Sequence, residues 1–425
     1  MGKYAFAGGK LVDGTGAAPV LDSLVLVDDT KITYAGPRTE IPEGYEVRDI
    51  TGKTIMPGLI DTHLHFSGNL TDDDNDWVIE SVAQKQAEAV KQSYQCLMHG
   101  LTTVCEIGRN GIAIRDLVNM GEFRGPRIFA TGLGFCRTAG HGDSHHLPPE
   151  ISKNSHPWGD QVDGPWALRH AIRLRLRENP DAIKIWATGG GIWRWDSGRK
   201  QLMSTEEIKA VAEECKETGI PLWSHSYNSV SAAYDSVRFG CEQMIHGFEL
   251  DEKTMDLMAE QGTFFTPTIG FLPIWYATYP PEYSPVLDQY EGDTVTEKEL
   301  QRTYANLRKA NEMGVIITTG SDCFANATPY GYVTIDEMYD FVDKAGISIM
   351  DTIKAATING AMMVHKEDEF GSLEAGKLAD LIVLNGDVAN NIHDLTVENM
   401  ELIMKEGDIA RQKIDGYDIY SPLAE

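Results

Sequence analysis

The sequence predicts an α/β protein in which a (β/α)8 TIM barrel carries a small composite β-sandwich formed by both chain ends. Short apolar stretches alternate with longer amphipathic ones through the middle of the chain. Both ends instead show the short alternating stretches and turn residues of β-structure. The eight stretches expected to form the barrel strands are 54–63, 102–107, 127–132, 182–188, 221–225, 243–247, 263–268 and 315–322.

Helical patterns lie between these strands. Residues 78–100 have apolar side chains at three- and four-residue spacing, and the pattern stops at Gly100. Residues 204–219 begin with Ser-x-x-Glu, a capping box, and end at a glycine. Residues 297–314 show the same type of pattern, and the eighth helix is expected near 348–364.

The two β-rich ends are each too small to form a core of their own. The first fifty residues are short apolar stretches separated by Gly, Asp and Pro, and similar stretches return in 370–387 and 398–411. We therefore expect the two ends to combine. The expected segments are 1–57 and 366–425 as the two parts of the β-sandwich and 58–365 as the barrel.

Charge and apolar content exclude several classes of partner. The 425 residues include 37 Lys and Arg against 64 Asp and Glu, and the resulting net charge of −27 repels a nucleic-acid backbone. No stretch approaches the ~18 consecutive apolar residues of a membrane helix, and the amino terminus lacks the apolar run of a signal peptide.

The six cysteines are scattered without a CxxC pair, which is typical of reduced thiols. We expect a cytoplasmic homo-oligomer that acts on a small molecule, with no nucleic-acid or membrane partner.

Potential metal ligands stand at five of the expected strands, near the carboxyl ends, where barrel active sites lie. His63 and His65 are two residues apart, so that both imidazoles point the same way in an extended segment. The other candidates are Lys184, His225, His246 and Asp322. A lone strand histidine is usually a core residue, but four at one barrel end together with an aspartate indicate a metal site. Imidazole and carboxylate ligands suit Zn²⁺, and Mn²⁺, Fe²⁺ or Co²⁺ are the alternatives.

Lys184 is the most unusual of these residues because it lies between Ile183 and Ile185 in an apolar strand. A buried lysine needs a partner or a changed protonation state. The alternative is a lysine whose stem is buried while its ammonium reaches solvent.

These motifs resemble those of a known family over nearly the whole chain. In chain order, PGLIDTHLHF, IKIWATGGG, SHS, IHG and TTGSD resemble the amidohydrolase superfamily of metal-dependent hydrolases. The closing GSLEAGKLADLIVL is similar to the stretch in which that superfamily returns to its β domain. The GHGD at 140–143, together with ATGGG after the lysine, most resembles the prolidase-like and imidazolonepropionase-related branch.

The resemblance implies a centre of two divalent metal ions. His63 and His65 match the pair that holds one ion, and His225 and His246 match ligands of the second. Lys184 matches the lysine that reacts with CO₂ to form a carbamate bridging both ions. The resemblance further implies that Asp322 binds metal and takes a proton from water.

The implied activity is cleavage of a C–N amide bond by a metal-activated hydroxide. The expected substrate is dipeptide-like or an N-acyl amino acid, as for prolidases and carboxypeptidases. The alternative is an aryl amide, urea, carbamate or cyclic amide, such as an ochratoxin- or phenylurea-like compound. A metal-free scaffold on the same fold is a third interpretation, which the intact ligand positions disfavour.

Four further residues are candidates for substrate contacts. His141 is expected to donate to the substrate carbonyl or orient its carboxylate, or else to be a structural loop residue. Tyr227 is expected to donate its hydroxyl to the tetrahedral oxyanion, or else to pack. In the insert 192–200, Trp193 and Arg194 indicate an aromatic wall with a cation for a carboxylate, against the alternative of surface packing.

The glycine run at 189–191 follows the lysine strand directly. It lacks both a following GK[ST] and a GxGxxG pattern, so a phosphate-binding loop is disfavoured. We expect these glycines to permit a close backbone approach beside the site.

Overall fold

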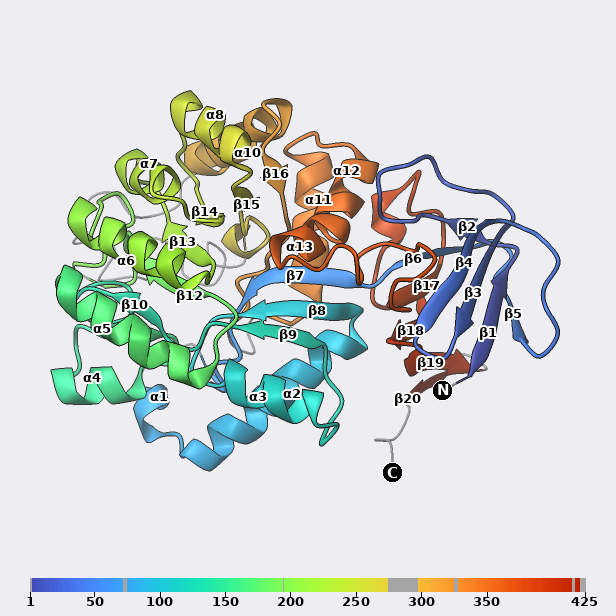
Figure 1. Ribbon diagram of the computed structural model, residues 1–425, viewed down its shortest axis with the longest axis horizontal. Helices are drawn as coiled ribbons and strands as arrows, with labels where there is room; N and C mark the ends of the chain where they lie inside the picture. Colours follow the sequence, from blue (N-terminus) through green and yellow to red (C-terminus); the bar gives the residue numbers. More distant parts are fainter. Residues whose placement is uncertain are drawn as a thin grey trace.

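The computed structural model describes residues 2–71, 75–193, 195–273, 297–324, 328–414 and 417–420. It is an α/β protein with a large part, in which helices surround parallel strands, and a β-rich part beside it (Figure 1). The blue segments of the amino-terminal end and the red segments of the carboxyl-terminal end lie side by side in the β-rich part.

Two sheets make up the β-rich part, with the strand orders β4-β3-β1-β5 and β2-β6-β17-β18-β19-β20. Strand β6 (Lys53–Pro57) runs antiparallel to β17 (Leu381–Asn385), so the two chain ends share one sheet, as predicted. Apolar residues of both sheets, among them Phe6, Val25 and Met404, form one buried cluster. The other strands are β1 (Lys3–Ala7), β2 (Lys10–Leu11), β3 (Ser23–Asp28), β4 (Lys31–Pro37), β5 (Glu46–Asp49), β18 (Met400–Lys405), β19 (Asp408–Ile414) and β20 (Tyr417–Tyr420).

The strands of the large part are all paired in parallel. They form a sheet of three strands, β7-β8-β9, and a sheet of seven, β11-β10-β12-β13-β14-β15-β16. Their bounds are β7 (Leu59–Leu64), β8 (Leu101–Glu106), β9 (Arg127–Ala130), β10 (Gly134–Cys136), β11 (Gly159–Gln161), β12 (Ile183–Trp186), β13 (Leu222–Ser226), β14 (Gln243–His246), β15 (Phe264–Thr266) and β16 (Ile316–Ile317).

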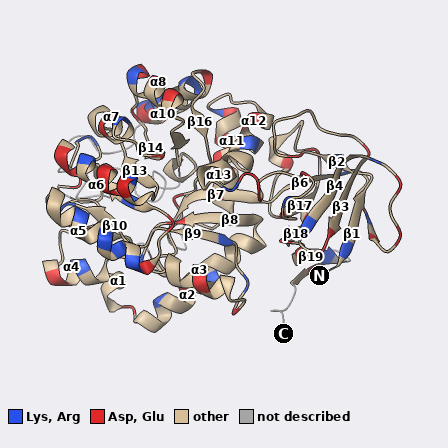
Figure 2. Ribbon diagram, in the orientation of Figure 1, with Lys and Arg blue, Asp and Glu red and all other residues tan. Residues whose placement is uncertain are grey.

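Helices follow most of these strands and carry many of the charged side chains (Figure 2). Helix α6 (Thr205–Thr218) begins with the predicted capping box of Ser204 and Glu207 and ends at Gly219, whose φ is 72°. The others are α1 (Asp76–Ile79), α2 (Val82–Met98), α3 (Gly111–Asn119), α4 (Pro149–Ser155), α5 (Pro165–Arg175), α7 (Val230–Arg238), α8 (Glu252–Gln261), α10 (Glu297–Glu312), α11 (Tyr332–Asp343), α12 (Ile349–Ala355) and α13 (Ile358–Met363).

Several predicted elements are divided in the structure. The expected strand 54–63 is two strands, β6 in the composite sheet and β7 in the parallel one. The chain changes sheets at Gly58, where a Cβ atom would lie only 2.2 Å from the Thr102 side chain. The expected helices 78–100 and 348–364 are each two helices, and of the expected strand 315–322 only Ile316–Ile317 keeps ladder pairing. Strands β10 and β11 were not predicted.

The end of β7 lies against the chain segment that follows β16. Thr62 N donates to Thr319 O at 2.8 Å, and Asp322 N donates to His63 O at 2.8 Å. The side chains of Thr62, Thr266 and Thr318 join in hydroxyl hydrogen bonds of 2.7–3.1 Å, so β7 also faces β15 and β16 inside the molecule. These contacts connect the three-stranded sheet with the seven-stranded one.

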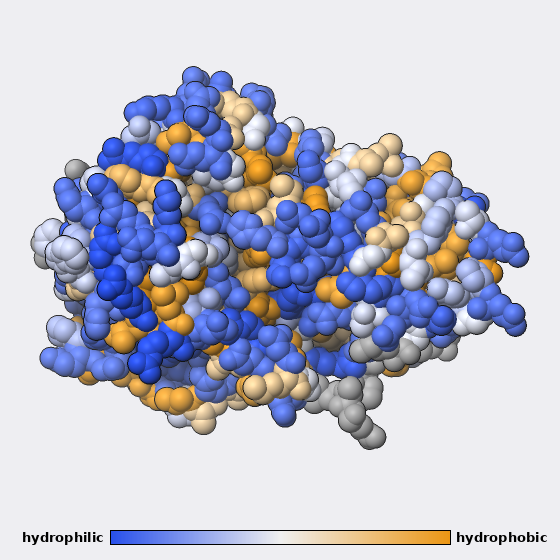
Figure 3. All heavy atoms as spheres, viewed as in Figure 1, coloured by the Kyte–Doolittle hydropathy of each residue, from blue (hydrophilic) through white to orange (hydrophobic). Residues whose placement is uncertain are grey.

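Other surface and core properties agree with the composition. All six cysteines are free and buried. None of the helices in the described part of the chain combines the length and apolarity that a bilayer crossing requires. The face shown in Figure 3 is largely hydrophilic, with apolar residues scattered among the polar ones.

Arg127 at the start of β9 joins the parallel strands to the composite sheet. Its guanidinium donates to Asp380 at 2.8 Å and to Glu406 at 2.5 Å, and it lies 4.2 Å from the ring centre of Phe370. The side chain of Asp380 is only 4% exposed. Asp380 also accepts a hydrogen bond from Glu406 N at 2.7 Å, so this carboxylate holds the turn between β18 and β19 against β9.

We expect Arg127→Met to lower the free energy of unfolding by about 3 kcal/mol, because removing one partner of a buried pair leaves the other charge uncompensated. Urea denaturation measures this change. The matched control is Arg38→Met, since the Arg38–Asp22 pair is 49% and 68% exposed, and its cost is expected below about 1 kcal/mol. Equal effects of the two substitutions would contradict the assigned role of Arg127.

Candidate functional site

The strand-end residues predicted from the sequence come together at one end of the parallel strands. His63 lies in β7, His225 in β13 and His246 at the end of β14. Their ring centres are close, with 5.4 Å between His63 and His246 and 4.4 Å between His225 and His246. His65 follows β7, with its ring centre 5.0 Å from that of His63.

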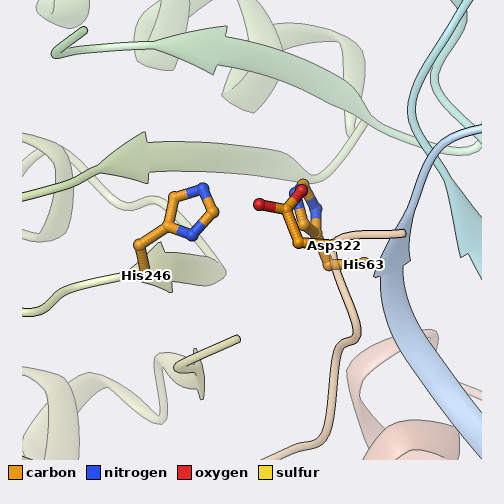
Figure 4. Close-up of side chains that lie close together, drawn as sticks. All are labelled: His63, His246 and Asp322. Carbon is orange, nitrogen blue, oxygen red and sulfur yellow. The ribbon is translucent and has the colours of Figure 1, made fainter. Parts of the chain in front are cut away.

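Asp322 lies at the centre of this histidine cluster. Its Oδ1 is 3.1 Å from Nε2 of His63 and 3.1 Å from Nε2 of His65. His63, His246 and Asp322 each offer a ligand atom, and these three atoms lie within 4.8 Å of one another (Figure 4). Figure 4 shows the Asp322 carboxylate turned toward the His246 ring. Such a group could hold a metal ion.

Hydrogen bonds to backbone carbonyls fix the tautomers of two of these histidines. His65 Nδ1 is 2.5 Å from Ile107 O and His225 Nε2 is 3.0 Å from Gly189 O. Because a carbonyl only accepts, each of these nitrogens carries the proton, and the other ring nitrogen has a free lone pair. The lone pair of His65 Nε2 therefore faces the Asp322 carboxylate oxygen, an arrangement that suits a cation bound between them.

Burial places these groups in the protonation states of metal ligands. Burial lowers the pKa of His63 to about 3 and the pKa values of His225 and His246 well below their usual range. Burial alone would raise the pKa of Asp322, but the hydrogen bond with His63 and the charge interactions with His63 and His246 outweigh it and hold this pKa well below its usual range. The site thus combines neutral imidazoles with an anionic carboxylate.

Lys184 lies in β12 with 1% of its surface exposed. Its Nζ has no hydrogen-bond partner among the described residues and lies 5.3 Å from the ring centre of Trp186. Burial lowers the pKa of this amine well below its usual range. The ladder pairs Trp186 with His225, and Lys184 stands two residues before Trp186, so Lys184 and His225 are on the same face of the sheet. The buried stem with a solvent-exposed ammonium is therefore the wrong interpretation.

Irregular backbone conformations change the direction in which the proposed ligand side chains point. The ladder pairs Ile245, not His246, with His225, so a regular strand would direct His246 to the opposite face. His246 instead has a left-handed φ of 70°, and Asp322 has a φ of 54°. The pairing of β7 with β8 also shifts register between Asp61 and Leu64. Such conformations concentrate at functional sites.

Two buried carboxylates hold the site loops and were not predicted from the sequence. Asp61 accepts hydrogen bonds from His63 N at 3.0 Å, from Ser321 N at 3.1 Å and from Thr334 Oγ1 at 2.7 Å. Glu337 in α11 accepts from Gly320 N at 2.7 Å and Ile269 N at 2.9 Å. The available signal was a carboxylate inside an apolar run, as in LIDTH.

The structure also places most of the predicted substrate-contact residues at this site. The ring centre of His141 lies 4.9 Å from that of His225, and the ring centre of Tyr227 lies 5.7 Å from that of His225. Trp193 lies farther out, 6.5 Å from His141 between ring centres. Arg194 lies outside the described residues.

Comparison with known proteins identifies the family. The model of the Amidohydrolase family matches residues 54–411, so the chain belongs to this family. It is accordingly a hydrolase that acts on carbon–nitrogen bonds.

Individual relatives come from the branch that the sequence motifs indicated. Ochratoxinase from Aspergillus niger is 28% identical over 411 residues, which cover 92% of this chain and 82% of the relative. Its crystal structure has a TM-score of 0.84 at 24% identity, covering 96% of each chain. A Xaa-Pro dipeptidase structure with bound methionine has a TM-score of 0.82 at 28% identity, covering 96% of this chain and 99% of that one. Imidazolonepropionase from Porphyromonas gingivalis is 22% identical, covering 85% of this chain and 82% of the relative.

We expect Asp61→Asn to lower the free energy of unfolding by about 1–3 kcal/mol, the usual cost of leaving a buried hydrogen-bonding group unsatisfied. All three neighbours of Asp61 donate to it, and an amide nitrogen cannot accept in place of the second oxygen. Chemical denaturation tests this. The control Asp256→Asn, at an exposed residue of α8, is expected to change stability by less than about 0.5 kcal/mol. A loss no larger than that of the control would contradict the role of Asp61.

Proposed function

We propose that this chain binds two divalent cations, with Zn²⁺ preferred, and hydrolyses the amide bond of a dipeptide-like or N-acyl amino acid substrate. The observation that carries the proposal is the group of buried histidines with the Asp322 carboxylate beside His63, His65 and His246. Two of the histidines, His65 and His225, direct a ring proton toward a backbone carbonyl and keep the other ring nitrogen free. The proposed ligands are His63, His65, Lys184, His225, His246 and Asp322.

When bound, the cations would polarise the scissile carbonyl and lower the pKa of water toward ~7. We assign proton transfer to Asp322, because its carboxylate is anionic and its Oδ1 lies 3.1 Å from Nε2 of both His63 and His65. It would accept the proton of the attacking water and return it to the leaving amine. His141 and Tyr227, whose rings both stack with that of His225, are proposed to bind the substrate carbonyl and the oxyanion.

We infer that Lys184 is present as a carbamate. A neutral amine adds to CO₂ to form an N–C bond and releases a proton, which leaves an anionic carboxylate at the end of the side chain. The buried position of Lys184, its depressed pKa and the lack of a described partner for Nζ all support this. The new carboxylate oxygens would then serve as metal ligands where the ammonium cannot.

The barrel expected from the sequence belongs to this proposal too. Residues 58–365 would form a closed (β/α)8 barrel, with 1–57 and 366–425 as the two parts of the flanking β-sandwich. Two hydrogen bonds support closure of the barrel on one side. Thr62 N donates to Thr319 O, and Asp322 N donates to His63 O, so that the end of β7 is joined to the segment after β16. The position of His63, His225 and His246 in the last two residues of parallel strands agrees with a barrel active site.

The relatives support two substrate classes. The Xaa-Pro dipeptidase favours a dipeptide with a carboxylate next to the scissile bond. The ochratoxinase favours the second candidate, a xenobiotic aryl amide. The ring centre of Trp193 lies 6.5 Å from that of His141 and 5.8 Å from that of His156. This position supports the proposal that Trp193 contacts the substrate.

The proposal is tested by a substrate panel combined with metal analysis. Purified protein is expected to contain one to two equivalents of Zn²⁺ or a similar ion, and removal of the metal by chelation should abolish hydrolysis, with recovery when the metal is restored. The panel contains dipeptides, N-acyl amino acids and aryl ureas. Full activity in metal-free protein would contradict the mechanism, and cleavage of aryl ureas alone would contradict the proposed substrate.

Lys184→Ala is expected to lower the bound metal below that of the parent and to reduce kcat by at least ~10²-fold, since the proposed anionic ligand would be lost. Short carboxylic acids supplied with metal should restore part of the activity by occupying the vacated space. Lys405→Ala is the control, because Lys405 lies in β18 of the composite sheet. Unchanged metal content and rate in Lys184→Ala would show that the lysine has only a structural role.

A further inference from the structure

The segment after the glycine run folds back and buries an aspartate, Asp196, beneath it. Asp196 has no exposed surface. Its Oδ1 accepts from Gly190 N at 3.1 Å and its Oδ2 accepts from Ile192 N at 3.1 Å. Its backbone oxygen also accepts from Gly191 N at 2.6 Å. One aspartate thus satisfies most of the backbone donors of this turn.

The same aspartate contacts the loop that carries His141. Its Oδ2 lies 3.0 Å from Nδ1 of His141. A carboxylate oxygen that already accepts a backbone hydrogen bond is an acceptor toward the imidazole as well, so Nδ1 carries the proton. Nε2 is then the ring nitrogen left for other partners, on a side chain that is 13% exposed beside His225.

The glycines are required by this close packing, as expected from the sequence. A Cβ atom on Gly189 would lie 2.2 Å from the backbone oxygen of Asp196. On Gly190, it would lie 2.2 Å from Cε1 of His141. Any larger residue at either position would push the aspartate or the imidazole away. The glycine run therefore lets Asp196 and His141 meet next to the candidate metal centre.

We propose that Asp196 is the positioning residue of His141, holding the ring beside His225 with its proton on Nδ1 and presenting Nε2 to the substrate. This inference rests on the proposed amide hydrolysis for the role of Nε2, but the tautomer itself does not depend on it. A His–carboxylate pair of this kind controls which nitrogen reacts, and the wrong tautomer is costly in enzymes that use one. The insert that begins after the glycine run thus contributes a carboxylate to the site in addition to the predicted aromatic residues.

The test replaces Asp196 with asparagine. In Asp196→Asn, one carboxylate oxygen becomes an amide nitrogen, which cannot accept a hydrogen bond. If it replaces Oδ1 it faces the donor Gly190 N, and if it replaces Oδ2 it faces the donors Ile192 N and His141 Nδ1. The imidazole is therefore expected to move or to change tautomer. We expect kcat to fall ~10²–10⁴-fold, while KM changes less than about threefold and metal content stays unchanged. In a His141→Gln background the same substitution should cost less than about threefold, because the two residues act as a unit.

Two measurements separate positioning from loop stability. The control Asp163→Asn removes a carboxylate that accepts from Thr138 N and Thr138 Oγ1, in the same loop as His141 but without contact to its ring, and it should leave kcat within about threefold. In ¹⁵N-histidine-labelled, zinc-loaded protein, His141 is expected to show a protonated Nδ1, with assignment by His141→Gln. This signal should shift or disappear in Asp196→Asn.

Several results would overturn the proposal. A parent protein with the proton on Nε2 alone would exclude the assigned tautomer, even where Asp196→Asn is too unstable to assay. An equal loss of kcat in the His141→Gln background, or a parallel loss of metal, would give Asp196 a role independent of His141. If the substrate panel gives no activity, the proposed hydrolysis fails while the ¹⁵N measurement still decides the positioning.

Discussion

The site depends on one interaction, the contact of the buried Asp61 carboxylate with two chain segments that are far apart in the sequence. Asp61 accepts from His63 N in its own strand and from Ser321 N and Thr334 Oγ1 beyond β16. It thereby fixes the segment that ends in Asp322 against the segment that carries the first two histidines. Burial raises the pKa of Asp61 to about 6, so its hydrogen bonds also offset the cost of keeping this carboxylate in the core. Together with the hydrogen bonds from Thr62 N to Thr319 O and from Asp322 N to His63 O, this contact brings the two ligand-bearing segments together.

Much of the site could be predicted because the period of a strand determines where its side chains point. His63 and His65 are two residues apart and both approach Asp322, as an extended segment requires. Lys184 was conspicuous because a charge in an apolar strand is costly. The shared sheet of the two chain ends was predictable for a similar reason, since neither end has enough apolar residues to form a core alone.

The remaining features depend on partners that a sequence does not name. The break between β6 and β7 falls at Pro57-Gly58 inside a long apolar run. This dipeptide signals a turn, but it does not show that the two halves pair with different neighbours, β6 with β17 and β7 with β8. His246 reaches the cluster through a left-handed backbone conformation, which local side-chain pattern does not predict for a histidine. In the sequence, Asp196 has the pattern of an ordinary polar loop residue. In the structure it lies under the glycine run with no exposed surface.

The pairing of β6 with β17 has a consequence for how the chain folds during synthesis. Thr54 of β6 donates to Gly386 O, a contact across 332 residues of sequence. A ribosome must therefore complete most of the chain before the middle of this sheet can form, and until then β6 has unpaired backbone groups and an apolar face. Closing so long a loop costs entropy before its contacts stabilise the fold. The nascent chain is thus most exposed to aggregation at β6, and the protein is expected to be sensitive to chaperone supply until its last strands emerge.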